Sequence, residues 1–204
     1  DKEYRLLQQR LDRNVTGAPD SPHFMEILKI LFSPEDANIA RQIPTRFVTV
    51  GRLAKKLGME PVALDGWITE MAHRGLVIDI GRGGRRYVSL APVAIGFFEY
   101  TFMRADDKLP LKELAGLFDA YMHGDDRFAR SVFVADTQIG RSLVREEALP
   151  EGDHTEILDW ERATWLIESA SAISVSLCAC RHKASHLGKA CDRPVENCIA
   201  LNMG

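Results

Sequence analysis

The sequence predicts a mainly α-helical protein with a small β-hairpin in a winged-helix-like domain, followed by further helices and a loop-rich cysteine segment. Three observations predict this class. Apolar residues recur at helical spacing over most of the 204-residue chain. Two β-prone runs flank a Gly-rich turn at residues 81–84. All four cysteines lie in the segment from residue 178 to residue 198, and residues 1–177, which contain most of the predicted helices and the hairpin, have none.

The region before the hairpin is expected to be helical. Residues 1–21 are polar, contain glycine and proline, and are interpreted as an N-terminal arm with a short docking helix. Apolar residues from Phe24 to Leu31 have the spacing of a core-facing helix. The run Ser33–Asp36 predicts the start of another helix, because serine caps a helix, proline fits its first turn and acidic residues favour its N-terminus.

The next region gives the winged-helix-like pattern. A short helix is predicted over Val48–Gly58, and a longer one runs from Pro61 to Arg74 with Gly75 as its C-terminal cap. Two β-prone runs around the Gly-rich turn then predict a hairpin. Helix, turn, helix and hairpin is the order of elements in a winged helix.

The rest of the chain is predicted as a helical connector and a cluster-binding region. An amphipathic helix is expected over Leu111–Met122, and the run Val132–Val134 has the composition of a strand. Residues Leu149–Asp153 are the best linker candidate, and a helix near Trp160–Ala170 leads to an extended segment at Ala172–Leu177. The predicted regions are therefore 1–21, 22–104, 105–148 and 149–204.

Composition narrows the function classes. The formal net charge of −3 argues against a nucleic-acid partner that is bound by bulk electrostatics. No apolar run approaches the length of a membrane span, and the N-terminus lacks the apolar centre of a signal peptide. We therefore expect a cytoplasmic protein, with a homodimer as one arrangement open to it.

The four cysteines predict a metal centre. Their spacing is C-x-C-x10-C-x6-C, formed by Cys178, Cys180, Cys191 and Cys198. Four thiolates suit either a cubane iron–sulfur cluster or a structural zinc ion. Structural zinc usually takes C-x2-C pairs, which are absent here, so the [4Fe-4S] cluster is the leading interpretation and zinc the alternative. Disulfides in an oxidised state, and a mixed site that uses His182 or His186, are further alternatives.

Residues between the cysteines are expected to tune such a cluster. A cluster held by four thiolates is anionic, and nearby cations raise its reduction potential. The candidates are Arg181, Lys183, Gly188, Lys189 and Pro194. The three cations would neutralise charge, the glycine would let the backbone approach a sulfide, and the proline would turn the chain to shield the cluster.

The predicted recognition helix argues against DNA binding. A winged helix reads DNA with basic residues of its second helix. The helix from Pro61 carries Asp65, Glu70 and Arg74, a net negative charge, whereas the hairpin carries a weak basic edge at Arg82, Arg85 and Arg86. We therefore expect a packing or protein-docking role for this domain. A redox- or metal-responsive transcriptional regulator stays open as the alternative function.

The cysteine segment resembles that of ferredoxin-type iron–sulfur proteins of anaerobic bacteria and archaea. The similarity covers the run from Cys178 to Cys198, and upstream the residues Phe32–Ala37 and Ala91–Arg104. In that family a winged-helix-like region precedes the segment, and further ferredoxin motifs usually follow it. The resemblance implies four [4Fe-4S] ligands and electron transfer beside a larger oxidoreductase or ferredoxin domains. Those further motifs are absent here, so the chain is either a fragment of a longer protein or a shorter relative with one cluster.

Overall fold

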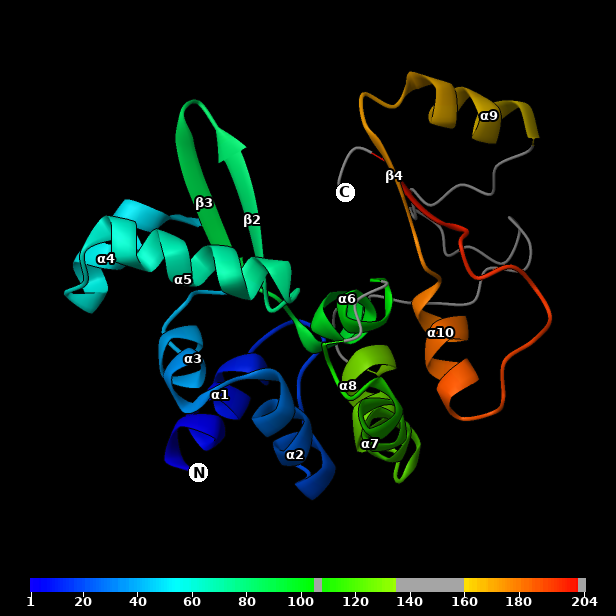
Figure 1. Ribbon diagram of the computed structural model, residues 1–204, viewed down its shortest axis with the longest axis horizontal. Helices are drawn as coiled ribbons and strands as arrows, with labels where there is room; N and C mark the ends of the chain where they lie inside the picture. Colours follow the sequence, from blue (N-terminus) through cyan, green and yellow to red (C-terminus); the bar gives the residue numbers. More distant parts are fainter. Residues whose placement is uncertain (105–107, 135–159, 202–204) are drawn as a thin grey trace.

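The computed structural model describes residues 1–104, 108–134 and 160–201, and in these ranges helices dominate (Figure 1). A three-stranded antiparallel sheet and a separate two-stranded sheet accompany them. The predicted fold class, mainly α with a small β-hairpin, is confirmed. In chain order the elements are α1 (Lys2–Leu11), α2 (Pro22–Leu31), α3 (Pro34–Ala40), β1 (Val48–Thr49), α4 (Val50–Leu57), α5 (Pro61–His73), β2 (Val77–Arg82), β3 (Arg85–Leu90), the irregular turn η1 (Val93–Phe97), α6 (Phe98–Phe102), α7 (Leu111–His123), α8 (Arg127–Phe133), α9 (Trp160–Ser169), β4 (Ile173–Ser176), α10 (Ala179–His186) and β5 (Cys198–Leu201).

Helix α1 belongs to the main core. Leu7 and Leu11 are fully buried, and the Tyr4 hydroxyl donates a hydrogen bond of 2.9 Å to the carbonyl of Phe32. Residues 1–21 contain the short helix that was expected, and this helix packs against α2 and α3. The predicted cap of α3 is present: the Ser33 hydroxyl accepts from the amide of Asp36, whose carboxylate accepts from the amide of Ser33.

The predicted hairpin is formed by β2 and β3, which pair antiparallel with Val77 opposite Leu90 and Arg82 opposite Arg85. Strand β1, which the sequence pattern placed within a helix, pairs with β3 on its other edge. Helices α4 and α5 precede the hairpin, and Figure 1 shows the hairpin projecting away from α1–α3. This is the order of elements expected for a winged helix, and the identification as one stays a prediction.

Gly75 fixes how α5 passes into β2. Its φ of +74° lies in the left-handed region, which side chains with a Cβ rarely adopt. A Cβ at this position would also lie 2.5 Å from the Cβ of Tyr100, which follows the hairpin in α6. The turn after α5 therefore needs glycine both for its backbone conformation and for its contact with α6.

Aromatic side chains join α2, α6 and α7 in the centre of the molecule. The rings of Phe98 and Phe118 have centroids 4.8 Å apart, and those of Phe24 and Tyr121 are 4.7 Å apart. Phe102 is fully buried beside Phe118. This aromatic cluster supports the last turn of α6, where the C-terminal segment attaches.

Residues Val132–Val134, which have strand composition, do not form a strand. Val132 lies in helix α8, where it and Phe128, one helical turn earlier, are buried. The ring of Phe128 packs against Tyr121 with centroids 5.1 Å apart. Packing on α7 has therefore overridden the local β propensity.

The C-terminal unit consists of α9, β4, α10 and β5, and lies to one side of α1–α3 in Figure 1. Only Ala179 and Lys183 of its residues are buried. The predicted linker 149–153 and the region boundary at 148–149 lie outside the described residues, as do residues 105–107 at the other boundary. None of the helices in the described ranges has both the length and the apolar character needed to cross a membrane.

Candidate metal centre at the cysteine segment

Two short strands bring the ends of the cysteine segment together. Strands β4 and β5 pair antiparallel with Ser176 opposite Cys198, although they are far apart in sequence. The pairing continues past the strands, because the amide of Cys178 donates to the carbonyl of Val195 at 2.7 Å. The first and last cysteines therefore lie on neighbouring stretches of backbone.

Helix α10 carries the second cysteine, in a region that was expected to be a loop. Cys178 is its N-cap residue, and Cys180 and Arg181 lie in its first turn. The first amides of a helix have no partner within the helix and carry partial positive charge, which favours anions at this end. The C-x-C pair therefore lies at the end of α10 where the helix dipole favours negative charge, and burial opposes this effect at Cys180.

Arg181 links the helix to the turn that carries the third cysteine. Its Nε donates to the Sγ of Cys191 at 3.3 Å, and its Nη1 contacts the side-chain oxygen of Asn197 at 2.8 Å and the carbonyl of Pro194 at 3.2 Å. The hydrogen bond to Cys191, together with the thiol of Cys178, raises the pKa of the guanidinium. Arg181 is the predicted neighbour that most directly contacts the thiols, and Pro194 contributes its carbonyl.

The thiols differ in how readily they ionise. The backbone amide of Arg193 and the guanidinium of Arg181 lower the pKa of Cys191, which is exposed. Burial raises the pKa of Cys180, and the charges of Cys178 and Glu99 act in the same direction. Cys191 therefore has the greater thiolate character at neutral pH, and thiolate is the form that binds metals.

Three contacts that the sequence pattern did not predict dock the segment on the helical core. The amide of Leu177 donates to the carbonyl of Met103 at 3.2 Å, and the Nδ1 of His182 lies 2.8 Å from the carbonyl of Phe102. Lys183 lies 3.1 Å from the carboxylate of Asp119 in α7, with its ammonium 5.7 Å from the centre of the Phe98 ring.

These contacts give the predicted cations different roles. Lys183 is buried, and its hydrogen bond is the main cause that lowers the pKa of Asp119. Lys189 is exposed and lies 3.5 Å from the same carboxylate. Both lysines therefore share a counter-ion on α7, whereas Arg181 directs its guanidinium to the cysteine turn. Residues as far apart as 119 and 183 carry no sequence signal for this pairing.

The two histidines and Gly188 have local structural partners. The Nε2 atoms of His182 and His186, one helical turn apart, lie 3.3 Å from each other, and both rings pack near Phe102. Gly188 has a φ of +66° just after α10, where the amides of Gly188 and Lys189 bond back to the last turn of the helix. Its left-handed conformation ends the helix, which is a second reason for glycine beside the one predicted.

The four thiols are not gathered into a finished site. None of them forms a disulfide. Across residues 1–104, 108–134 and 160–201, no three histidine, cysteine or acidic side chains lie close enough together to hold a metal ion. The donor chemistry fits a cubane cluster or zinc, because four unpaired thiols lie in one segment together with Arg181, which contacts Cys191. Their assignment as ligands stays a prediction.

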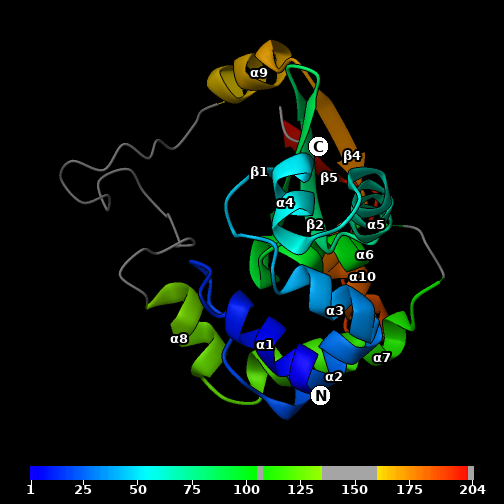
Figure 2. The same ribbon diagram turned by 90° about the vertical axis from the view of Figure 1, so that its left-hand side faces the viewer.

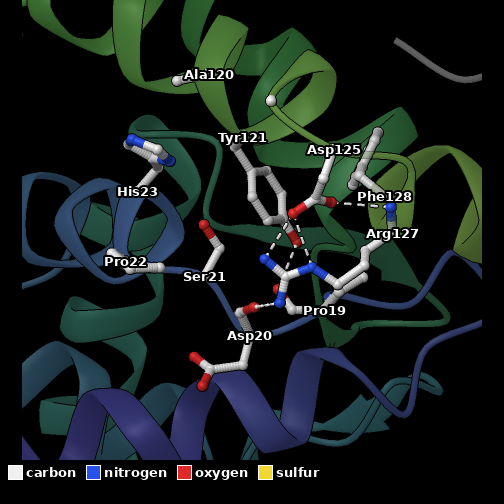
Figure 3. A pocket seen from close by; sticks show the side chains of 11 residues that line it. Pro19, Asp20, Ser21, Pro22, His23, Ala120, Tyr121, Asp125, Arg127 and Phe128 are labelled. Carbon is white, nitrogen blue, oxygen red and sulfur yellow. Dashed lines mark hydrogen bonds and ion pairs between the residues drawn. The ribbon is translucent and has the colours of Figure 1, made fainter.

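The polar groups that line a small pocket elsewhere take part in hydrogen bonds and an ion pair within the protein (Figure 3). It has a volume of about 130 Å³ and lies between the start of α2 and the adjoining ends of α7 and α8. Arg127 pairs with Asp125 at 2.7 Å and donates to the carbonyl of Asp20, also at 2.7 Å, while the Tyr121 hydroxyl donates to the carbonyl of Pro19 at 3.1 Å. Burial raises the pKa of Tyr121, so its phenol stays a donor. These bonds hold residues 19–20 against the helices.

The exposed face of α5 has few basic or polar side chains that could bind nucleic acid. Its exposed residues are Pro61, Val62, Ala63, Gly66, Glu70 and His73. In the hairpin, Arg86 pairs with Asp79 at 2.9 Å and with Asp65 of α5 at 3.0 Å, which offsets its charge. Arg82 and Arg85 remain exposed at the hairpin turn. The face that would enter a DNA groove is therefore apolar or acidic for most of its length.

The chain matches no protein-family model, and neither a curated protein nor a solved structure shows similarity to it. The relation to ferredoxin-type proteins therefore remains a resemblance of the residues named above.

Proposed function

We propose that this protein holds one [4Fe-4S] cluster on Cys178, Cys180, Cys191 and Cys198 and transfers electrons to or from a larger oxidoreductase or ferredoxin domains. The observation that supports this most is the contact of Arg181 with the thiol of Cys191, next to Cys178 at the start of α10. It places a cation against one of the four unpaired thiols of the segment. Such a cation favours an anionic cluster.

Different residues would bind the cluster, stabilise its negative charge and hold its segment against the core. The four cysteines would supply the thiolates, and Cys191, with its lowered pKa, would bind more readily than Cys180, whose pKa is raised. Arg181 and the first amides of α10 would stabilise the negative charge. The contacts of α10 with α6 and α7 hold this end of the segment against the core. When bound, the cluster would supply one-electron redox chemistry.

The alternatives are less well supported. Zinc is compatible with four thiols, but this spacing lacks the C-x2-C pairs of most structural zinc sites. A DNA-binding regulator would need a basic, polar face on α5, and the exposed residues there are mostly apolar. We therefore place electron transfer ahead of both.

Metal and sulfide analysis of anaerobically purified protein tests the proposal. We expect about four iron and four sulfide per chain, broad absorption near 400 nm, and a reversible one-electron signal. Each Cys→Ser variant of the four should lose most of the iron, whereas His186→Ala should retain it. Stoichiometric zinc in a colourless protein, or iron retained in all four variants, would exclude the proposed cluster.

A further inference from the structure

His182 and His186 form a pair on one face of α10. They are one helical turn apart, and their Nε2 atoms lie 3.3 Å from each other. A zinc ion that takes both atoms as ligands at about 2.0–2.1 Å in tetrahedral geometry needs them about 3.3–3.4 Å apart. The distance between the two nitrogens is therefore the one that a shared zinc ion requires.

The backbone of α6 fixes the orientation of His182. Its Nδ1 lies 2.8 Å from the carbonyl oxygen of Phe102, and because a carbonyl oxygen can only accept, this nitrogen carries the proton. The neutral imidazole of His182 then has its lone pair on Nε2, the atom that lies next to His186. Histidines that bind metals commonly donate from their other ring nitrogen to a carbonyl or carboxylate in this way.

Packing holds both imidazoles in place. The fully buried ring of Phe102 has its centroid 6.1 Å from that of His182 and 6.4 Å from that of His186. Helix α10 lies beside α6 and α7 in both views (Figures 1 and 2). Both histidines are nevertheless partly exposed, so an ion from solvent can reach them. Ligands that packing already orients lose less conformational entropy when they bind a metal ion.

The two cations that adjoin His182 in sequence have partners of their own. Lys183 lies 3.1 Å from the carboxylate of Asp119, which offsets its charge. Arg181 donates from its guanidinium to the thiol of Cys191 and to the side chain of Asn197. These contacts reduce the repulsion that either side chain would exert on a metal ion bound by the histidines.

We propose that His182 and His186 bind a divalent transition-metal ion, with zinc as the best fit, through their Nε2 atoms and independently of the four cysteines. Imidazole nitrogen suits zinc, nickel and copper, and two histidines one turn apart on a helix are a known way to hold zinc. Among the described residues, no third histidine, cysteine or acidic side chain lies close enough to complete the site. Water would therefore fill the remaining positions, and the ion would be exchangeable.

Equilibrium dialysis of the anaerobically purified full chain against Zn²⁺ tests this site. Wild type is expected to bind about one zinc ion more per chain than His186→Gln, whatever the cysteines hold. Glutamine can still hydrogen-bond to His182 but is not an ordinary zinc ligand, so this variant separates metal binding from a contact between the two side chains. The matched control is His73→Gln, at an exposed histidine of α5, which should bind as much zinc as wild type. Equal zinc in wild type and His186→Gln would overturn the proposal and leave the two rings as a hydrogen-bonded pair.

Hydrogen exchange of the α10 amides gives a second readout. Added zinc should slow this exchange more in wild type than in His186→Gln, because an ion bound by both histidines stabilises the helical turn between them. Without added zinc the two proteins should protect α10 to a similar degree, which checks that the variant still folds. The same response to zinc in both proteins would contradict the site.

The histidine site goes beyond the proposed electron transfer and can fail separately from it. Iron and sulfide content reports on the cysteines, whereas the difference in zinc between wild type and His186→Gln reports on the histidines. The same difference should remain in a Cys178→Ser background, where serine also suits the N-cap of α10. Its loss in that background would show that a thiol shares the ion, and would overturn a site made by the histidines alone.

Discussion

At the scale of single residues, the sequence pattern predicts which residues lie near the cysteines better than it predicts what their side chains contact. Arg181 was expected near a cluster because it stands between cysteines, and it does contact Cys191. Lys183 was expected in the same role, yet it is buried against Asp119 of α7. Spacing along the chain places both near the cysteines, but only tertiary packing decides which way a side chain of a helix points.

Gly75→Ala tests the tight contact between α5 and α6. We expect a loss of at least about 2 kcal/mol in the free energy of unfolding, because the left-handed φ and a crowded Cβ both oppose alanine. Gly66→Ala is the control: no atom lies within 4 Å of its Cβ position, and alanine favours the interior of α5 by about 0.5–1 kcal/mol. Urea denaturation measures both. Equal effects of the two substitutions would contradict this account of Gly75.

Arg181→Ala tests the influence of the guanidinium on Cys191. Removing this cation should raise the pKa of the Cys191 thiol, so alkylation of the metal-free protein at neutral pH should become slower. The pH profile of the alkylation rate should move to higher pH but stay below that of an ordinary cysteine, because the amide of Arg193 remains. Lys189→Ala, at an exposed cation paired with Asp119, should leave the profile in place. An unchanged profile in Arg181→Ala would exclude the interaction.

At the scale of elements, helices with a strong amphipathic pattern or a capping signal were predictable, and helices with neither signal were not. The start of α3 at Ser33 and the hairpin were confirmed because local signals determine them. Helix α10 was missed because only two of its eight residues are buried, which leaves almost no apolar periodicity. The strand prediction for Val132–Val134 was wrong, because the two valines favour a strand locally, whereas packing against α7 stabilises the helix α8 that contains Val132.

The ion pair between α10 and α7 makes their docking depend on pH. The pKa of Asp119 is lowered in the folded protein, so its contribution is complete above the ordinary aspartate pKa of about 3.9 and is lost as pH falls through the lowered value. Asp119→Asn should weaken the docking at neutral pH by about 0.5–1 kcal/mol, as for a partly exposed pair. Hydrogen exchange of the α10 amides measures this local opening.

The matched control for this ion pair is the double variant Asp119→Asn/Lys183→Met. It removes the buried ammonium that would otherwise lack its partner, so it should regain part of the loss. Asp119→Asn should also remove the additional opening of α10 between neutral pH and pH values below the aspartate range. Protection of α10 that is identical in wild type and Asp119→Asn at neutral pH would show that the pair does not hold the helix.

At the scale of the whole molecule, the described residues form two groups: a core stabilised by buried apolar side chains, and a C-terminal unit with almost none. Among the described residues, the buried apolar side chains lie between residues 4 and 132, and Ala179 is the only one from the C-terminal unit. The sequence pattern predicted the helical part well because burial produces periodicity. It could not predict the arrangement of the C-terminal unit, because exposed strands and a cysteine segment with few buried residues leave no such periodicity.

This division predicts what removal of the proposed cluster does. Because the helical core contains almost none of the C-terminal side chains, its thermal unfolding and far-UV circular dichroism should change little after chelation. Hydrogen exchange of β4, β5 and α10 should accelerate, since a bound group that contacts only the folded segment stabilises that segment. A Cys198→Ser variant should show the same local acceleration without a chelator. If chelation lowered the unfolding temperature of the whole chain cooperatively, the cysteine segment and the core would form one folding unit, and this prediction would be wrong.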